Sequence, residues 1–334
     1  MNRRKFVHNS AKAGLAISFL GTYACKQAKK AEDGDTMADA PDTESVEPFF
    51  KLSLAQWSIN KMIREGGVDP YTFAEKAKAW GFTGLEYVSQ LYKNELEPAN
   101  YSEEAMQGFI DKCNAEAEKH GLQNVLIMVD RQGDLAAADA EERKAAVENH
   151  YKWVDAAAAM GCHAIRVNLN GIQEPEAWTA ASVDGLGQLA TYAKDKNINV
   201  TVENHGGLSS NAAMLAQVMT QVNMDNCGTL PDFGNFCIKR EDGSYYESKC
   251  IEEYDKYKGV EELMVHAKAV SAKSHTFDEN GNEANIDYER MMKIVKDAGY
   301  AGYVGVEYEG SELSEEAGIL ATKNLLLEVA AKLG

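Results

Sequence analysis

The sequence has few prolines, no excess of positive charge and no glycine-rich nucleotide-binding motif after its apolar segments. Its 334 residues include 6 Pro and 27 Gly, and 45% are hydrophobic, so the composition lies outside the disordered and collagen-like classes. Asp and Glu number 52 against 34 Lys and Arg, a net charge of −18, which repels the phosphate backbone of nucleic acids. We therefore expect a folded protein without a nucleic-acid partner.

The six cysteines exclude further architectures. No two of them stand at Cys-x-x-Cys spacing, so the sequence predicts neither a zinc knuckle nor a complete disulfide framework. Cys237 and Cys250 flank a polar insertion, and a disulfide between them in an oxidising compartment is one alternative. We interpret the other cysteines of the folded domain as buried thiols.

Residues 1–25 have the order of an export signal, in which basic residues precede an apolar segment. The apolar segment 13–20 is too short to span a bilayer, and the two arginines near the start resemble a twin-arginine signal. Ala24 and Cys25 resemble the processing and lipidation site of bacterial lipoproteins, although Thr22 stands where leucine is usual. We predict an exported, periplasmic protein, and a lipid anchor at Cys25 stays an open alternative.

The composition divides the rest of the chain into two parts. Residues 26–48 are acidic and lack apolar periodicity, which predicts a disordered tether. Residues 49–334 then form a single folded domain, close to the typical length of a (β/α)₈ barrel.

Eight short strand-like segments alternate with helical patterns in residues 49–334. They are 51–57, 82–88, 124–129, 163–169, 198–203, 227–232, 263–269 and 303–308. Such alternation predicts a parallel sheet. Four helical segments end in glycine just before the next strand, where the chain commonly needs a left-handed conformation. The repeat of about forty residues predicts an α/β fold, a (β/α)₈ TIM barrel.

Reactive side chains of a parallel barrel lie at the carboxyl ends of its strands. Four predicted strands carry a carboxylate or an imidazole there: Glu203, Asp232, His266 and Glu307. Each lies on the face opposite the apolar residues of its strand, so we expect all four to point into the barrel. Crowded carboxylates repel one another, and a divalent cation removes that penalty. The set predicts one divalent metal ion, with Mn²⁺, Mg²⁺ or Co²⁺ favoured and Zn²⁺ also compatible.

Five motifs are similar to those of the xylose isomerase-like barrels, a superfamily of sugar isomerases and epimerases. They are Gly81–Glu86, Val202–Gly207, Asp232–Asn235, His266–Lys268 and Gly305–Glu307. The resemblance implies that Glu203, Asp232, His266 and Glu307 bind the metal and that Glu203 and Glu307 transfer protons. Asn235 stands where many epimerases have histidine, and residues 271–275 lack an arginine that is common there. These departures indicate altered substrate contacts.

Seven further polar or aromatic side chains are candidates for substrate contact. They are Glu86, Arg166, Asn168, His205, Asn235, Lys268 and Trp57. Several have a structural alternative. The carboxylate at 86 is either a sugar ligand or a paired barrel carboxylate, and Arg166 with Asn168 either binds substrate or forms ion pairs. His205 is either a site residue or a helix cap, and Trp57 either stacks on a sugar or packs in the rim.

A metal bound to a carbonyl and a neighbouring hydroxyl acidifies the adjacent C–H, so that a carboxylate base can remove the proton to give an enediolate. We predict a sugar isomerase or epimerase with a small, unphosphorylated carbohydrate substrate, because an exported acidic protein rarely meets sugar phosphates. A keto-glycoside lyase or hydrolase with the same metal and base is the first alternative. A carbohydrate-binding lipoprotein without catalysis is the second. The oligomeric state is left open.

Overall fold

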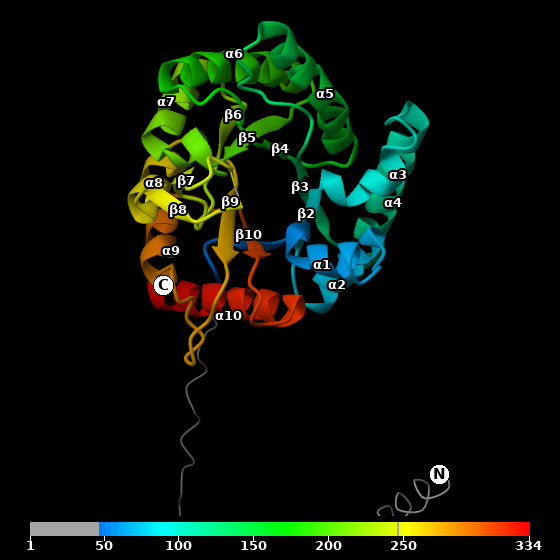
Figure 1. Cartoon of the computed structure of the whole chain (residues 1–334). Helices are drawn as coiled ribbons and strands as arrows, with labels where there is room; N and C mark the ends of the chain where they lie inside the picture. Colours follow the sequence, from blue (N-terminus) through cyan, green and yellow to red (C-terminus); the bar gives the residue numbers. More distant parts are fainter. Residues whose placement is uncertain (1–46, 246) are drawn as a thin grey trace, which may run out of the picture. The chain divides into compact units, whose positions relative to one another are not determined.

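The computed structural model describes residues 47–245 and 247–334 (Figure 1). The predicted export signal, residues 1–25, lies outside the described residues, as do residues 26–46 of the predicted tether. Among the helices of the described part, none combines the length and the apolar character that crossing a bilayer requires.

Eight parallel strands in the described residues form a barrel surrounded by helices (Figure 1). The strands are β1 (Lys51–Ala55), β2 (Gly84–Val88), β3 (Gln123–Val129), β4 (Ala164–Val167), β5 (Asn199–Glu203), β6 (Cys227–Leu230), β9 (Val270–Ser274) and β10 (Tyr303–Tyr308). Strand β1 pairs with both β2 and β10. Two bridges, Thr229–Ala267 and Asp232–Ser271, join the β6 and β9 segments. The predicted TIM barrel is therefore confirmed.

Most of the longer helices begin where a side chain caps them. The longer ones are α2 (Phe73–Ala79), α4 (Glu103–His120), α5 (Ala140–Ala159), α6 (Pro175–Lys194), α7 (Ala212–Val222), α8 (Lys256–Met264), α9 (Tyr288–Asp297) and α10 (Glu315–Leu333), and α1 (Asn60–Arg64) and α3 (Lys93–Leu96) are short. The Ser102 side chain accepts the Ala105 N–H at the start of α4. The same helix ends at Gly121, whose φ of +64° a residue with a Cβ rarely adopts.

The barrel strands present one face to the helices and the other to the barrel interior. Val200 and Val202 of β5, like Val304 and Val306 of β10, are fully buried on the face that packs against helices. Because side chains alternate along a strand, the residue that ends β5, Glu203, points into the barrel. Hydrophobic packing outside the barrel thus determines which polar side chains meet inside it.

The seventh barrel strand is not where the sequence predicted it. The predicted strand 263–269 is wrong, because Leu263 and Met264 belong to α8 and β9 begins only at Val270. Val260, Leu263 and Met264 are buried and recur at helical spacing, so the segment is apolar without being a strand. The sixth strand, β6, also ends two residues earlier than predicted, at Leu230.

A small antiparallel hairpin follows β6. Its strands, β7 (Cys237–Arg240) and β8 (Cys250–Glu253), are joined by a disulfide between Cys237 and Cys250, so the pairing that the sequence left open is present. The Tyr245 hydroxyl in this segment donates to the Gly171 carbonyl at 3.3 Å and accepts from the Gln173 side chain. The hairpin therefore links the loops that follow β6 and β4. The remaining cysteines of the described part are buried or half-buried thiols.

Candidate functional site

Three carboxylates meet at the carboxyl end of the barrel. Glu203 ends β5, Glu307 lies near the end of β10, and Asp232 follows β6 by two residues. Carboxylate oxygens of the three lie within 4.8 Å of one another, and no more than 3% of each residue is exposed. The barrel therefore gathers into one buried cluster three acids that are far apart in the sequence.

Strand β9 adds a serine and a lysine to this carboxylate cluster. Ser271 Oγ lies 2.7 Å from Asp232 Oδ2 and 2.9 Å from Glu307 Oε2. Lys273 Nζ lies 3.0 Å from Glu307 Oε2 and 3.7 Å from Asp232 Oδ2. The same ammonium is 3.1 Å from Glu309 Oε1. One buried cation thus balances part of the negative charge.

The carboxylate cluster retains more negative charge than its own cations balance. Burial raises the pKa of Glu203 to about 7, while Arg166 acts in the opposite direction. Burial also raises the pKa of Asp232 to about 7, against the effect of Lys273. Burial alone would lower the pKa of Lys273, but Asp232, Glu307 and other carboxylates raise it well above its ordinary value. Near neutral pH the cluster therefore has a high affinity for protons or for another cation.

Arg166 joins the cluster to a further buried carboxylate. Its Nε lies 2.8 Å from Glu203 Oε2, and its Nη1 lies 2.9 Å from Asp130 Oδ1. The Asn168 side chain donates to the same Asp130 oxygen at 2.9 Å. Burial opposes the ionisation of Asp130, but Arg166 holds its pKa below the ordinary value. The structural ion pairing that the sequence left open for Arg166 is present, and substrate contact by Arg166 and Asn168 stays a prediction.

Two asparagines orient the carboxylates. Asn235 Nδ2 donates to Glu203 Oε1 at 2.9 Å, and the Asn235 backbone N–H donates to Asp232 Oδ1 at 2.9 Å. Asn204 Oδ1 accepts the backbone N–H of Asp232 at 2.8 Å, and its Nδ2 donates to the Asp232 carbonyl at 3.0 Å. The position of Asp232 beyond the end of β6 is therefore set by hydrogen bonds rather than by the sheet.

His266 and Lys268 lie away from the carboxylate cluster. The Thr229 N–H donates to the His266 carbonyl, and the Lys268 N–H donates to the Thr229 carbonyl, so both residues stand beside the middle of β6. Among the described residues, the cluster contains no histidine. His266 therefore lies outside the cluster that could hold a metal, and metal binding by His266 and substrate contact by Lys268 stay predictions that this placement does not support. Because β9 begins at Val270, Ser271 and Lys273 occupy the positions that point into the barrel.

Glu86, on β2, is buried inside the barrel. Ser53 Oγ donates to Glu86 Oε1 at 2.6 Å, whereas Oε2 has no hydrogen-bond partner among the described residues. Gly305 leaves room for this carboxyl group, because a Cβ at 305 would lie 2.5 Å from Glu86 Oε2. Burial raises the pKa of Glu86 to about 8, although the Ser53 hydrogen bond opposes the shift. Glu86 is 1% exposed and, like Glu203 and Asp232, does not line the site cavity; sugar contact by Glu86 stays a prediction.

One carboxylate of the cluster, Glu307, lines a cavity of about 670 Å³, which we call the site cavity. His205 lines it, with Nε2 4.0 Å from Glu203 Oε1. Burial, followed by the charges of Arg166 and Lys273, lowers the pKa of His205. The predicted substrate-contact residues that line the site cavity are Trp57, Arg166, Asn168, His205 and Asn235. Their contact with a substrate stays a prediction.

The sequence analysis missed four residues of the site. They are Asp130, Ser271, Lys273 and Glu309. Two of them alternate with Val270 and Ala272 on β9, and this period of two was the available signal. The other two directly follow β3 and β10. Their positions directly after two predicted strands were the signal that could have identified them as site residues.

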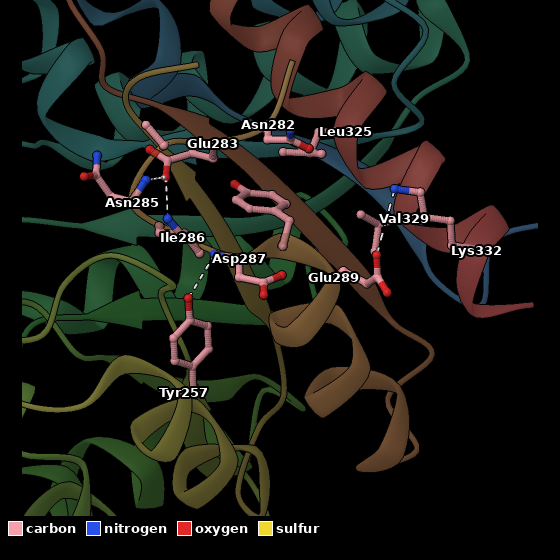
Figure 2. A pocket seen from close by; sticks show the side chains of 12 residues that line it. Tyr257, Asn282, Glu283, Asn285, Ile286, Asp287, Glu289, Leu325, Val329 and Lys332 are labelled. Carbon is pink, nitrogen blue, oxygen red and sulfur yellow. Dashed lines mark hydrogen bonds and ion pairs between the residues drawn. The ribbon is translucent and has the colours of Figure 1, made fainter. Parts of the chain in front are cut away.

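A second cavity, of about 400 Å³, lies between the loop before α9 and helix α10 (Figure 2). In Figure 2 the Glu283 carboxylate accepts the backbone N–H groups of Asn285 and Ile286, both at 2.6 Å. The Tyr257 hydroxyl accepts the N–H of Asp287 at 2.9 Å. None of the three clustered carboxylates lines this cavity. Its hydrogen bonds hold the loop and the start of α9.

The fold and the carboxylate cluster agree with one known family. Residues 74–328 match the model of the xylose isomerase-like TIM barrels. The chain belongs to this family. Comparison with the sequences of curated proteins gives no match.

Several solved structures share the fold of this family member. An L-ribulose 3-epimerase is 16% identical, with a TM-score of 0.63 over 85% of this chain and 96% of its own. An IOLI protein with a bound zinc atom is 14% identical, with a TM-score of 0.62 over 85% of this chain and 99% of its own. A xylose isomerase-like barrel from Mycobacterium smegmatis in complex with magnesium is 15% identical, with a TM-score of 0.58 over 85% of this chain and 97% of its own.

The carboxylate cluster fits a divalent cation. Three carboxylates with oxygens within 4.8 Å of one another, beside the Ser271 hydroxyl, form the oxygen-rich set that hard cations prefer. The raised pKa values of Glu203 and Asp232 give the same indication, since burial raises them and a bound cation offsets the cost of burying their negative charge. Lys273 competes for the same oxygens, so its contact with Glu307 must loosen when an ion binds.

Proposed function

We propose that this protein is a divalent-metal-dependent sugar isomerase or epimerase that moves a proton on a carbon next to a carbonyl. The observation that carries the proposal is the convergence of Glu203, Asp232 and Glu307 beside the site cavity. Membership of the xylose isomerase-like family supports it. The neighbouring structures support it as well, because they include sugar epimerases and barrels with zinc or magnesium.

In this mechanism Glu203, Asp232 and Glu307 hold the ion, which when bound polarises the substrate carbonyl. Mg²⁺ or Mn²⁺ suits these oxygen donors best, since no imidazole lies in the described cluster. Trp57, at the site cavity, offers an aromatic wall for the apolar face of a sugar. The substrate is a small carbohydrate.

Glu203 and Glu307 act as the two proton-transfer groups. Arg166 and Asn235 hold one carboxylate oxygen each of Glu203, which fixes the orientation of this group for proton transfer. Glu307, fixed by Ser271 and Lys273, is presented from another strand. A proton removed by one carboxylate and returned by the other to the opposite face inverts the carbon. Return to the neighbouring carbon isomerises the sugar.

One observation favours a second candidate, a keto-glycoside lyase with the same first step. The site cavity, at about 670 Å³, lies within the range of sites that hold drug-sized ligands. A glycoside with two rings therefore has room there. Expulsion of a substituent one carbon further along then replaces the return of the proton.

The test combines metal analysis with solvent exchange. The full-length chain, loaded with Mg²⁺ or Mn²⁺, is incubated with a panel of free sugars and keto-glycosides in D₂O, and deuterium next to the carbonyl and release of the aglycone are measured. We expect Glu203→Gln and Glu307→Gln to lower turnover by about 10²- to 10⁴-fold. The exposed Glu261, changed to Gln, is the matched control. Chelation without effect on any exchange, or full activity of both variants, would contradict the proposal and favour a carbohydrate-binding protein.

We also propose that the protein is exported to the periplasm. The proposal rests on the sequence pattern of residues 1–25, and the disulfide between Cys237 and Cys250 fits an oxidising compartment. Cell fractionation of the full-length chain tests export, and Cys25→Ser tests lipidation through loss of membrane association. Recovery of the chain in the cytoplasmic fraction alone would contradict it.

A further inference from the structure

The site cavity is lined by carboxylates and by guanidinium groups, and most of these guanidinium groups form no ion pair among the described residues. The sequence has only eight arginines and a net charge of −18, yet four of the eight line this one cavity: Arg64, Arg131, Arg166 and Arg240. Arg166 is paired with Glu203 and Asp130. The other three have no carboxylate oxygen within 4.0 Å among the described residues. We call Arg64, Arg131 and Arg240 the rim arginines.

Arg131 starts from a rigidly held backbone. The preceding residue, Asp130, is fixed by Arg166 and Asn168 through its side chain and by Ser89 Oγ through its backbone N–H, at 3.0 Å. Arg131 itself has a φ of +58°, a conformation that side chains with a Cβ rarely adopt and that clusters at functional sites. Its side chain is exposed and extends from a backbone that is held in place at the edge of the site cavity.

Arg240 is held on the disulfide-linked hairpin. Its Nε donates to the Tyr245 carbonyl at 2.9 Å, and its Nη1 donates to the Ser248 carbonyl. One nitrogen of the guanidinium, Nη2, has no hydrogen-bond partner among the described residues, so its N–H groups are available as donors. Because the two carbonyl groups are neutral, they do not cancel the positive charge of the Arg240 guanidinium at the site cavity.

Arg64 lies beside an aromatic wall. It is the last residue of α1, and its guanidinium carbon is 5.8 Å from the centre of the Trp57 ring. Both side chains line the site cavity. A ligand that covers Trp57 thus meets a positive charge next to the ring.

We propose that the sugar bound in this cavity carries an anionic group, a carboxylate or a phosphate, which the rim arginines bind while the ring lies toward the carboxylate cluster. The planar fork of an arginine matches both kinds of anion with two parallel hydrogen bonds. The net charge of −18 opposes anions at long range, but ions in water screen that field beyond about 10 Å. Within that distance the positive charge of the rim arginines attracts an anionic group on the substrate.

This inference rests on the proposed function for the presence of a sugar, but its test needs no turnover. Isothermal titration calorimetry of the full-length chain with Mg²⁺ measures binding of three probes: D-galacturonate, D-glucose 6-phosphate and D-glucose. We expect one of the two acidic probes to bind at least about tenfold more tightly than glucose, because a hydrogen bond to a charged group is worth about 10- to 100-fold in affinity. The preference between the acidic probes distinguishes a sugar acid from a sugar phosphate.

Single variants identify the arginine involved. We expect Arg64→Ala, Arg131→Ala or Arg240→Ala to remove the advantage of the acidic probe and leave glucose binding unchanged, and added NaCl to weaken only the acidic probe. Arg290→Ala is the matched control, since Arg290 stacks on Tyr257 away from the site cavity. Equal binding of glucose and both acids, or no loss in any of the three variants, would overturn the inference. Inorganic phosphate binding as tightly as the sugar phosphate would also overturn it. Absence of exchange in D₂O with arginine-dependent binding intact would reject only the proposed function.

Discussion

Replacement of Glu86 by Gln should stabilise the protein, and the gain should grow with pH. Glu86 is 1% exposed, and burial raises its pKa to about 8, whereas an unfolded chain ionises a glutamate near pH 4.3. A raised carboxyl pKa means that stability is fully present below the unfolded pKa and is lost as the pH rises toward the folded pKa. Glutamine has no such loss, because it is neutral at every pH.

The size of the effect follows from these two values. Between pH 5 and pH 7 the unfolded wild-type chain releases this proton while the folded chain retains it, which costs about 1.4 kcal/mol per pH unit. The difference in unfolding free energy between Glu86→Gln and wild type should therefore widen by about 3 kcal/mol over this interval. Burying an amide costs the glutamine variant about 1–3 kcal/mol of unfolding free energy. This cost is the same at pH 5 and at pH 7, so it does not alter the predicted widening.

The assay is urea unfolding of both proteins at pH 5 and pH 7, with chelator present so that no bound cation alters the charge near Glu86. The exposed Glu261, changed to Gln, serves as control for the loss of a negative charge. A stability difference that is the same at both pH values would refute the reasoning, since it would mean that the buried carboxyl group ionises at the same pH in the folded and unfolded chains.

Three further predictions concern the same interior. Lys273→Met should lower the unfolding free energy of the metal-free protein by about 3 kcal/mol, because it leaves buried carboxylates unpaired, yet tighten Mn²⁺ binding measured by calorimetry; weaker Mn²⁺ binding would contradict it. Mn²⁺ affinity should fall between pH 8 and pH 6, since Glu203 and Asp232, with pKa values of about 7, take up competing protons; a flat profile would refute this. Gly305→Ala should lower the thermal midpoint through its clash with Glu86, and adding Glu86→Ala should restore it.

Much of the barrel was predictable because its determinants are local. Buried strands such as β5 combine apolar residues on one face with a terminal acid, and glycines such as Gly121 mark helix ends. Strand β9 has only part of this pattern, since Val270 and Ala272 alternate with the polar residues Ser271 and Lys273 but no acid ends the strand. The apolar end of α8 was more hydrophobic than the true strand, so hydrophobicity alone favoured the wrong segment.

The candidate site was predictable in its acids but not in its cations. Glu203, Asp232 and Glu307 stand at strand ends, where barrel topology alone brings them together. The ion pairs of Lys273 with Asp232 and Glu307 depend on the register of β9 against β10, in which Lys273 lies opposite Glu307. A register of this kind is set by tertiary packing. The predicted histidine lies outside the cluster for that reason, because β9 begins at Val270 and Ser271, rather than His266, contacts Asp232 and Glu307.

The missing side chain at Gly305 limits which substitutions this protein can accept in evolution. A methyl group there would overlap the carboxyl group of Glu86, which comes from a strand more than two hundred residues earlier in the chain. As long as a glutamate persists at 86, position 305 can accept no larger amino acid without strain. Descendants with a larger residue at 305 should therefore also have a smaller residue at 86, whereas position 86 can change while Gly305 stays.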